Sequence, residues 1–277
     1  MAWVIEPLSY AFMQRGLAAA LIVGVVCSVI GCFVVLKSMA FMGDAMAHAI
    51  LPGVAVAYLL QANLFVGALA AAILVALGIG YFSKEGTIKE DTVIGILFSF
   101  ALALGIVLIS SIRSYAVDLS HILFGNVLGV SPQDLWLTGI LAGFVIVTII
   151  VLYKPLLVLS FDPILASSLR LPTGLLRYTL LILLSLTIVV SIQSVGVGLV
   201  AAMLVTPAAT AFLLARRLPM MMLLSALFGS MASLIGLYVS YYANVASGAG
   251  IVLTSSLFFI VVFIFSPRRS RAQYWRK

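Results

Sequence analysis

Long apolar stretches separated by short polar breaks run through almost the whole chain. Each holds roughly 18–22 residues, the length that a helix needs to cross the hydrocarbon core of a bilayer. The predicted spans are 14–36, 42–60, 63–82, 92–112, 133–153, 174–192, 196–214, 219–241 and 246–266. The alternating segments of a membrane barrel are absent. The pattern predicts an all-α, polytopic transmembrane helical bundle of about nine helices, or eight if one is a re-entrant piece, in a single domain over residues 1–277.

The composition supports this interpretation. The 277 residues are 64% hydrophobic and only 8% charged, whereas soluble domains carry about 25% charged residues. The net charge of +7 raises the question of a nucleic-acid partner. However, the basic residues gather at the ends of the spans, where they report membrane orientation. We therefore expect lipid, and no nucleic acid, around this chain.

The basic residues fall mainly on one side if the spans alternate across the bilayer. With a cytoplasmic C-terminus, only Arg15 and Arg113 of the 15 basic residues lie outside. Those inside are Lys37, Lys84, Lys89, Lys154, Arg170, Arg177, Arg216, Arg217, Arg268, Arg269, Arg271, Arg276 and Lys277. The positive-inside rule thus predicts a cytoplasmic basic tail over 267–277. Residues 1–13 mix aromatic and polar side chains, which predicts an interfacial segment.

One stretch, Lys37 to Leu60 (KSMAFMGDAMAHAILPGVAVAYLL), carries ionisable residues within an apolar span. Asp44 and His48 are four residues apart, so a helix places them on one face. Carboxylate and imidazole together are typical of a site for a divalent transition metal. A buried pair satisfied by hydrogen bonds is the alternative, but ionisable groups within a membrane are costly and usually functional. Met42 and Met46 flank the pair as weaker candidate ligands, with packing the favoured interpretation.

Three residues in the apolar spans are expected to interrupt or bend a helix. Pro52 lacks an N–H, which leaves the carbonyl of His48 without its usual partner. Gly43 is expected to break the helix and to set its N-terminus deeper, where the helix dipole would favour the carboxylate. Pro207 similarly frees the carbonyl of Met203. It is a candidate gating bend, although a structural kink is the favoured interpretation.

Two loops are too long to be plain connections. The outer loop, 114–132, contains His121 near Asp118. His121 is a weaker candidate for passing metal inward or meeting a delivering protein, with a solvated surface histidine as the alternative.

The inner loop, 155–172, contains a predicted short helix. Asp162 followed by Pro163 is typical of an N-cap and first helical position, so we expect a helix of about two turns over 164–170. A short helix on the cytoplasmic face is suited to contact a soluble partner, and an amphipathic connector is the alternative. The candidate contact residues are Asp162, Pro163, Ile164, Ala166, Arg170 and Pro172.

Five runs in order carry a family likeness. They are GDAMAHAILPG, IKEDTVIGILFSFALALG, DLSHILFGNVLGVS, SFDPILASSLRLP and VGVGLVAAMLVTPAATA. From about Gln14 to Ser266 the chain resembles the membrane permease of ABC importers for manganese, iron or zinc. The LFGN and LGVS motifs resemble the manganese/iron branch of this family more than the zinc branch. The resemblance implies the fold of a type II ABC importer permease in a bacterial plasma membrane.

The same resemblance implies partners and roles. They are a second copy or a related permease, two cytoplasmic ATP-binding subunits, and an extracytoplasmic metal-binding protein. A two-fold axis would combine Asp44 and His48 from both copies, and the 155–172 loop would couple to the ATPases. The family usually has glycine where Arg170 stands. No permanently bound cofactor is expected, because the metal is cargo.

These features favour a transporter rather than an enzyme. The chain has no GxxxxGK[ST] phosphate loop, so ATP hydrolysis would come from partner subunits. An intramembrane metalloenzyme is disfavoured, because it would need more metal ligands and a general base, and the HExxH motif is absent. A secondary transporter driven by an ion gradient is the alternative function. Its proton relay would need several acids or histidines across the membrane, but the other acids fall in loops or at span ends. The sequence therefore predicts an ATP-driven importer that works by alternating access around Asp44 and His48.

Overall fold

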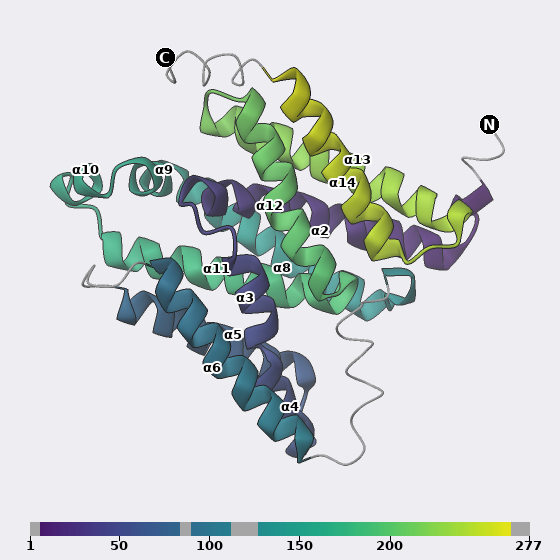
Figure 1. The fold of residues 1–277 in the computed structure, drawn as a ribbon, viewed down its shortest axis with the longest axis horizontal. Coiled ribbons are helices and arrows are strands. Elements are labelled where there is room, and N and C mark those ends of the chain that lie inside the picture. The colour runs from purple at the N-terminus through teal and green to yellow at the C-terminus, as the bar shows by residue number, and fades with distance from the viewer. Residues whose placement is uncertain (1–5, 84–89, 112–126, 267–277) are drawn as a thin grey trace.

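The computed structural model describes residues 6–83, 90–111 and 127–266, and every regular element within these ranges is helical (Figure 1). The all-α prediction is thereby confirmed for the described part of the chain. The elements are α2 (Ala11–Leu36), α3 (Met42–Ala49), α4 (Leu51–Leu59), α5 (Leu64–Phe82), α6 (Glu90–Ser110), η1 (Val127–Gly129), α8 (Pro132–Val151), α9 (Tyr153–Phe161), α10 (Pro163–Ser168), α11 (Thr173–Val195), α12 (Val197–Leu214), α13 (Leu218–Ala243) and α14 (Ser247–Phe265).

The predicted spans correspond closely to these helices. Eight candidate membrane spans are long and apolar enough to cross a bilayer, with α3 and α4 counted together, and α12 holds a shorter apolar helix, Leu199–Leu214. Together they account for the nine predicted stretches. One stretch differs, because the span predicted over 42–60 divides at Ile50 into two helices. The first span also begins earlier, at Ala11.

Central and peripheral helices differ in how much of their surface the bundle covers. Within the most apolar window of each helix, 72% of the residues of α2 are buried, against 22% in each of α6, α8 and α14. Figure 1 shows α13 and α14 on one side of α2, with α5 and α6 on the other side. The short helix α3 lies between these parts and packs against α5, α6, α11 and α12. Its residues are therefore held by both halves of the bundle.

Small residues allow the helices to approach closely. Lipid tails are as apolar as leucine, so helix association in a membrane depends on close packing and polar contacts rather than on the hydrophobic effect. Gly31 in α2 lies against the backbone of Leu204 in α12, where a Cβ atom would overlap the Leu204 carbonyl. Gly53 in α4 and Gly67 in α5 face each other in the same way. These contacts fix the spacing of α2 with α12 and of α4 with α5.

Hydroxyl groups add polar contacts between α13 and α2. The Ser225 hydroxyl donates to the carbonyl of Ser28 at 2.9 Å, and the Ser233 hydroxyl donates to the carbonyl of Ala20 at 2.9 Å. All four residues are buried. Because a buried polar group without a partner is costly, these bonds also fix the register of the two helices.

We predict that Gly31→Ala lowers the thermal stability of the purified protein in detergent. The new methyl group forces α2 and α12 apart, and overpacking of this kind costs about 1–3 kcal/mol. Gly143→Ala in α8 is the matched control, because no atom lies within 4 Å of its added Cβ. Unfolding followed by fluorescence checks both variants. Equal unfolding temperatures for Gly31→Ala and the wild type would show that this contact does not limit the packing.

Candidate metal path and coupling segment

The helix α3 is short because the backbone turns on both sides of it. Before it, Ser38 has a left-handed backbone (φ 58°), and after it Ile50 separates α3 from α4. Pro52 lies in the first turn of α4, where its missing N–H removes no intrahelical bond. The break therefore precedes the proline. The break expected at Gly43 lies before Met42 instead, since Gly43 is the second residue of α3 and packs near Leu204, but the helix N-terminus does lie beside Asp44, which is in the first turn.

Asp44 and His48 lie one turn apart on the same face of α3, as predicted. The Nδ1 atom of His48 lies 3.0 Å from the backbone oxygen of Asp44 and 3.7 Å from its carboxylate Oδ1. A carbonyl oxygen can only accept, so Nδ1 is the donor in this hydrogen bond, and Nε2 is the ring nitrogen available to face a metal ion. The side chain of Asp44 is 57% exposed, and that of His48 is 28% exposed. Both donor groups are therefore accessible from outside this copy of the chain.

The side chain of Phe98 also belongs to this site. Its ring meets the imidazole of His48 edge-on, with 6.0 Å between ring centroids. Phe98 comes from α6, which packs along α3 and α4. The contact limits rotation of the imidazole. Sequence reasoning assigned no role to Phe98, because only the packing of α6 against α3 brings the two rings together.

The two methionines lie on the other side of α3. Met42 and Met46 have fully buried side chains that belong to the hydrophobic core. The exposed pair Asp44 and His48 is offset from them around the helix axis, as a spacing of two residues requires. Packing thus explains both methionines, and the structure does not bring them together with the candidate ligands.

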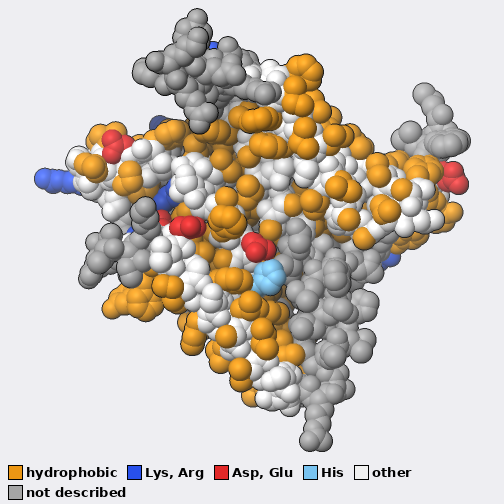
Figure 2. Space-filling model, viewed as in Figure 1, with side chains coloured by type: hydrophobic (Ala, Val, Ile, Leu, Met, Phe, Trp, Pro, Cys, Tyr) orange, Lys and Arg blue, Asp and Glu red, His pale blue; other side chains and the backbone are white. Residues whose placement is uncertain are grey.

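Asp44 and His48 alone supply only part of a coordination shell. Among the described residues, no group of three or more His, Cys, Asp or Glu side chains could hold a metal ion. Figure 2 shows a histidine beside an acidic side chain in the middle of a largely hydrophobic face. A carboxylate and an imidazole are suitable donors for manganese, iron or zinc. The donor set fits such a cargo ion, and further ligands would be needed to complete the shell around these two side chains.

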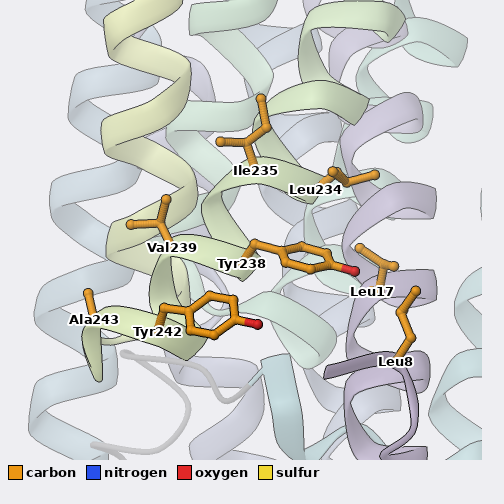
Figure 3. A pocket seen from close by; sticks show the side chains of 8 residues that line it. All are labelled: Leu8, Leu17, Leu234, Ile235, Tyr238, Val239, Tyr242 and Ala243. Atoms are coloured by element: carbon orange, nitrogen blue, oxygen red, sulfur yellow. The ribbon is translucent and has the colours of Figure 1, made fainter. Parts of the chain in front are cut away.

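Two apolar hollows lined by described residues contain neither candidate ligand. One of 760 Å³ lies between α2 and α13, where Figure 3 shows the hydroxyls of Tyr238 and Tyr242 pointing toward the side of Leu17 and Leu8. Another, of 560 Å³, is lined by α4, α5 and α6 and includes Pro52. Both linings are predominantly apolar, so neither hollow offers a site for a cation.

Pro207 lies inside α12 and is buried. It leaves the carbonyl of Met203 without an N–H partner from position 207. Because α12 packs directly against α3, the missing hydrogen bond at Pro207 lies in a helix next to the one that carries the candidate ligands.

The helix start predicted at Asp162 and Pro163 is confirmed. The Asp162 Oδ1 atom accepts from the N–H groups of Ile164 and Leu165 at 3.0 and 2.9 Å, and Pro163 is the first residue of α10. The helix is shorter than predicted, because it ends at Ser168. A second helix, α9, was not predicted. Pro155 lies within its first turn, where a proline is tolerated.

Arg170 lies two residues beyond the end of α10 and has a left-handed backbone with φ 56°. Its N–H donates to Ser167 and the N–H of Leu171 donates to Ala166, at 2.9 and 3.1 Å. This pair of bonds is the Schellman motif, in which glycine is the usual left-handed residue. Glycine, which the sequence resemblance implies at this position, would adopt this conformation freely, whereas Arg170 occupies it with some strain.

The short helix presents apolar side chains on its surface. Ile164 is 78% exposed and Leu169 is 57% exposed, whereas Ala166 is buried against the rest of the chain and Pro172 is exposed. Figure 1 shows α9 and α10 projecting at one end of the bundle. Apolar residues exposed together outside the long helices are typical of a protein contact. His121, the tail over 267–277 and residues 1–5 lie outside the described residues.

We call residues 155–172, which include α10 and most of α9, the coupling segment. We predict that Arg170→Gly stabilises this segment, whereas Arg170→Val destabilises it. Glycine adopts the left-handed conformation freely, and a β-branched side chain is disfavoured there by about 1–2 kcal/mol. Hydrogen exchange of amides in α10 measures the local effect. Faster exchange in Arg170→Gly than in the wild type would contradict the strain at this position.

Comparison with known proteins gives a consistent result. The model of the ABC 3 transport family matches residues 9–266. The chain is 51% identical over 272 residues to the manganese transport system membrane protein MntC of Halalkalibacterium halodurans, covering 98% of this chain and 93% of that protein. It is 42% identical over 261 residues to the chelated iron transport system membrane protein YfeD of Yersinia pestis, covering 94% and 88%.

A solved structure has the same fold. The complex described as PsaBC from Streptococcus pneumoniae with Fab contains a chain that is 42% identical, with a TM-score of 0.86 and coverage of 98% of both chains. The family match spans more than half of the sequence, and the relatives agree along nearly its full length. This chain therefore belongs to the ABC 3 transport family.

Proposed function

We propose that this chain is the membrane permease of an ATP-driven importer that carries a divalent transition metal ion into the cytoplasm. The observation that carries the proposal is the accessible pair Asp44 and His48 on α3. Manganese or iron is favoured over zinc, because relatives include a manganese and a chelated iron transport protein. Carboxylate and imidazole groups are suitable donors for these ions. A site for cargo holds its ion loosely enough to release it.

The exposed carboxylate supports assembly with a second permease, either another copy or a related chain. Asp44 is 57% exposed although it lies in a helix of a candidate membrane span. A charge facing hydrocarbon is costly, so a partner that covers this face stabilises it. Two copies about a two-fold axis would provide two carboxylates and two imidazoles. The second copy would thereby complete a shell that Asp44 and His48 of one chain leave incomplete.

The segment α9–α10 supports docking of two cytoplasmic ATP-binding subunits. Its exposed side chains, Ile164 and Leu169, offer an apolar contact, and Asp162 fixes the start of the helix that carries them. ATP hydrolysis would occur in those subunits, and their closure would move this segment. The distribution of basic residues supports an orientation with this segment and the C-terminus on the cytoplasmic side of the bacterial plasma membrane. An extracytoplasmic metal-binding protein would deliver the ion on the other side.

A secondary transporter coupled to an ion gradient is less well supported. Proton relays in such proteins use several acids or histidines within the membrane. Apart from Asp44, the acids among the described residues lie at helix ends or outside helices: Glu6, Glu90, Asp91, Asp134 and Asp162. The described part of the chain thus offers no series of titratable groups across the bundle.

We expect Asp44→Asn and His48→Ala each to reduce metal uptake roughly 10- to 100-fold, an effect typical of disturbing a metal ligand or its support. Uptake in cells lacking other importers measures this, with membrane expression checked in parallel. Met42→Leu and Met46→Leu are the controls, because they conserve volume in the core and should leave uptake nearly unchanged. Uptake at the wild-type level in either ligand variant would reject the assignment.

We expect Ile164→Asp to abolish stimulation of ATP hydrolysis by a metal-loaded binding protein. The new charge would be placed in an apolar contact with the ATPase, where burying it unpaired is unfavourable. Reconstituted complexes with the candidate ATP-binding subunits provide the measurement. Metal uptake driven by a pH gradient, in vesicles that lack any ATPase, would instead favour the secondary transporter.

A further inference from the structure

A half-buried ionic cluster joins the beginning of α11 to the neighbouring ends of α5 and α6. The Nε and Nη2 atoms of Arg177 donate to the same Glu90 oxygen, Oε1, at 3.2 and 3.0 Å. The Nη1 atom donates to the backbone carbonyl of Ser83 at 3.2 Å, and Nη2 also contacts the Ser83 hydroxyl. The Arg177 and Glu90 side chains are only 22% and 25% exposed. The guanidinium thus binds two separate parts of the α5–α6 pair.

The ionic cluster lies between the end of the coupling segment and the helix that reaches His48. Arg177 lies on α11 five residues after Pro172, where the coupling segment ends. Ser83 caps α5 and Glu90 begins α6. The helix α6 continues along α3 and carries Phe98, whose ring contacts His48. A continuous path of contacts therefore leads from the coupling segment to a candidate metal ligand.

A third charge comes from the segment that leads into α3. Lys37 directly follows α2, and burial lowers the pKa of its ammonium group. Glu90 raises the pKa of Lys37 and Arg177 lowers it, so both lie close enough to act on its charge. Glu90 thus binds Arg177 directly and also favours the charged form of Lys37. Loss of Glu90 would leave Arg177 partly buried without its counter-charge.

We propose that Arg177 and Glu90 are positioning residues that transmit movement of the coupling segment to the α5–α6 pair beside the metal path. The inference rests on the proposed function, because it requires ATP-binding subunits that move this segment. An isolated exposed ion pair contributes too little for this role. Here the pair is half-buried, and the same guanidinium also binds the backbone at Ser83. Displacement of α11 would therefore carry the ends of α5 and α6 with it.

The principal experiment compares ATP hydrolysis with manganese uptake in proteoliposomes that contain the complete importer. In Arg177→Gln and Glu90→Gln, the proposal predicts that hydrolysis stays within about twofold of the wild type, whereas uptake falls roughly tenfold, a typical size for coupling between sites. The double variant should lose no more uptake than either single variant, because both changes remove one link. Asp91→Asn, the exposed neighbour of Glu90, is the matched control and should behave as the wild type.

A merely structural role would give a different result. Hydrolysis and uptake would then fall together with the yield of the complex, and that outcome would overturn the proposal, as would unchanged uptake in both variants. Absence of ATP-dependent uptake in the wild-type complex would instead reject the proposed function itself. The two failures are therefore distinguishable.

A distance measurement on the otherwise unchanged complex tests the same link without removing it. Spin labels at Leu175→Cys on α11 and Thr92→Cys on α6 would occupy exposed positions, while the native Cys27 and Cys32 are buried. The proposal predicts the same distance between the labels with and without bound ATP, since α11 and the start of α6 move together. A clear change in this distance on ATP binding would overturn it.

Discussion

A carboxylate and an imidazole on the accessible face of a membrane helix set the constraint from which the rest of the structure follows. Asp44 and His48 are costly in hydrocarbon, so their helix cannot simply face lipid. In this fold α3 is only eight residues long, and it is held by α5, α6, α11 and α12. Its methionine face is buried in the core, and only the polar face remains open. A second permease covering that face would shield these polar groups from lipid and would bring ligands from two chains together around a cation.

The surrounding bundle keeps this short helix in place. Glycine contacts between α2 and α12 and between α4 and α5 bring helix backbones together, and serine hydroxyls on α13 bind backbone carbonyls of α2. These contacts are of the kind that stabilises helices in lipid. The break at Ile50, the proline within α12 and the segment α9–α10 are where the backbone departs from regular helices.

How well the sequence predicted each feature depended on the range of the interactions behind it. The spans, the Asp44–His48 spacing and the cap at Asp162 rest on residues within a few positions of one another, and the structure agrees with them. The helix α9 was missed because Pro155 suggested a loop. The ionic cluster was missed because Arg177 lies 87 residues from Glu90 and 94 residues from Ser83. Only the packing of α11 against α5 brings those groups together, and no local pattern indicates it.

The central claim is that the two candidate ligands from each of two chains hold the transported ion together. A structure of the assembled permease with manganese bound, in which anomalous scattering locates the metal, tests this claim most directly. The account predicts one metal peak between the two copies of α3, within coordination distance of the Asp44 carboxylate and of His48 Nε2 from both copies. A peak elsewhere in the bundle, or Asp44 side chains that face lipid in the assembled permease, would contradict it.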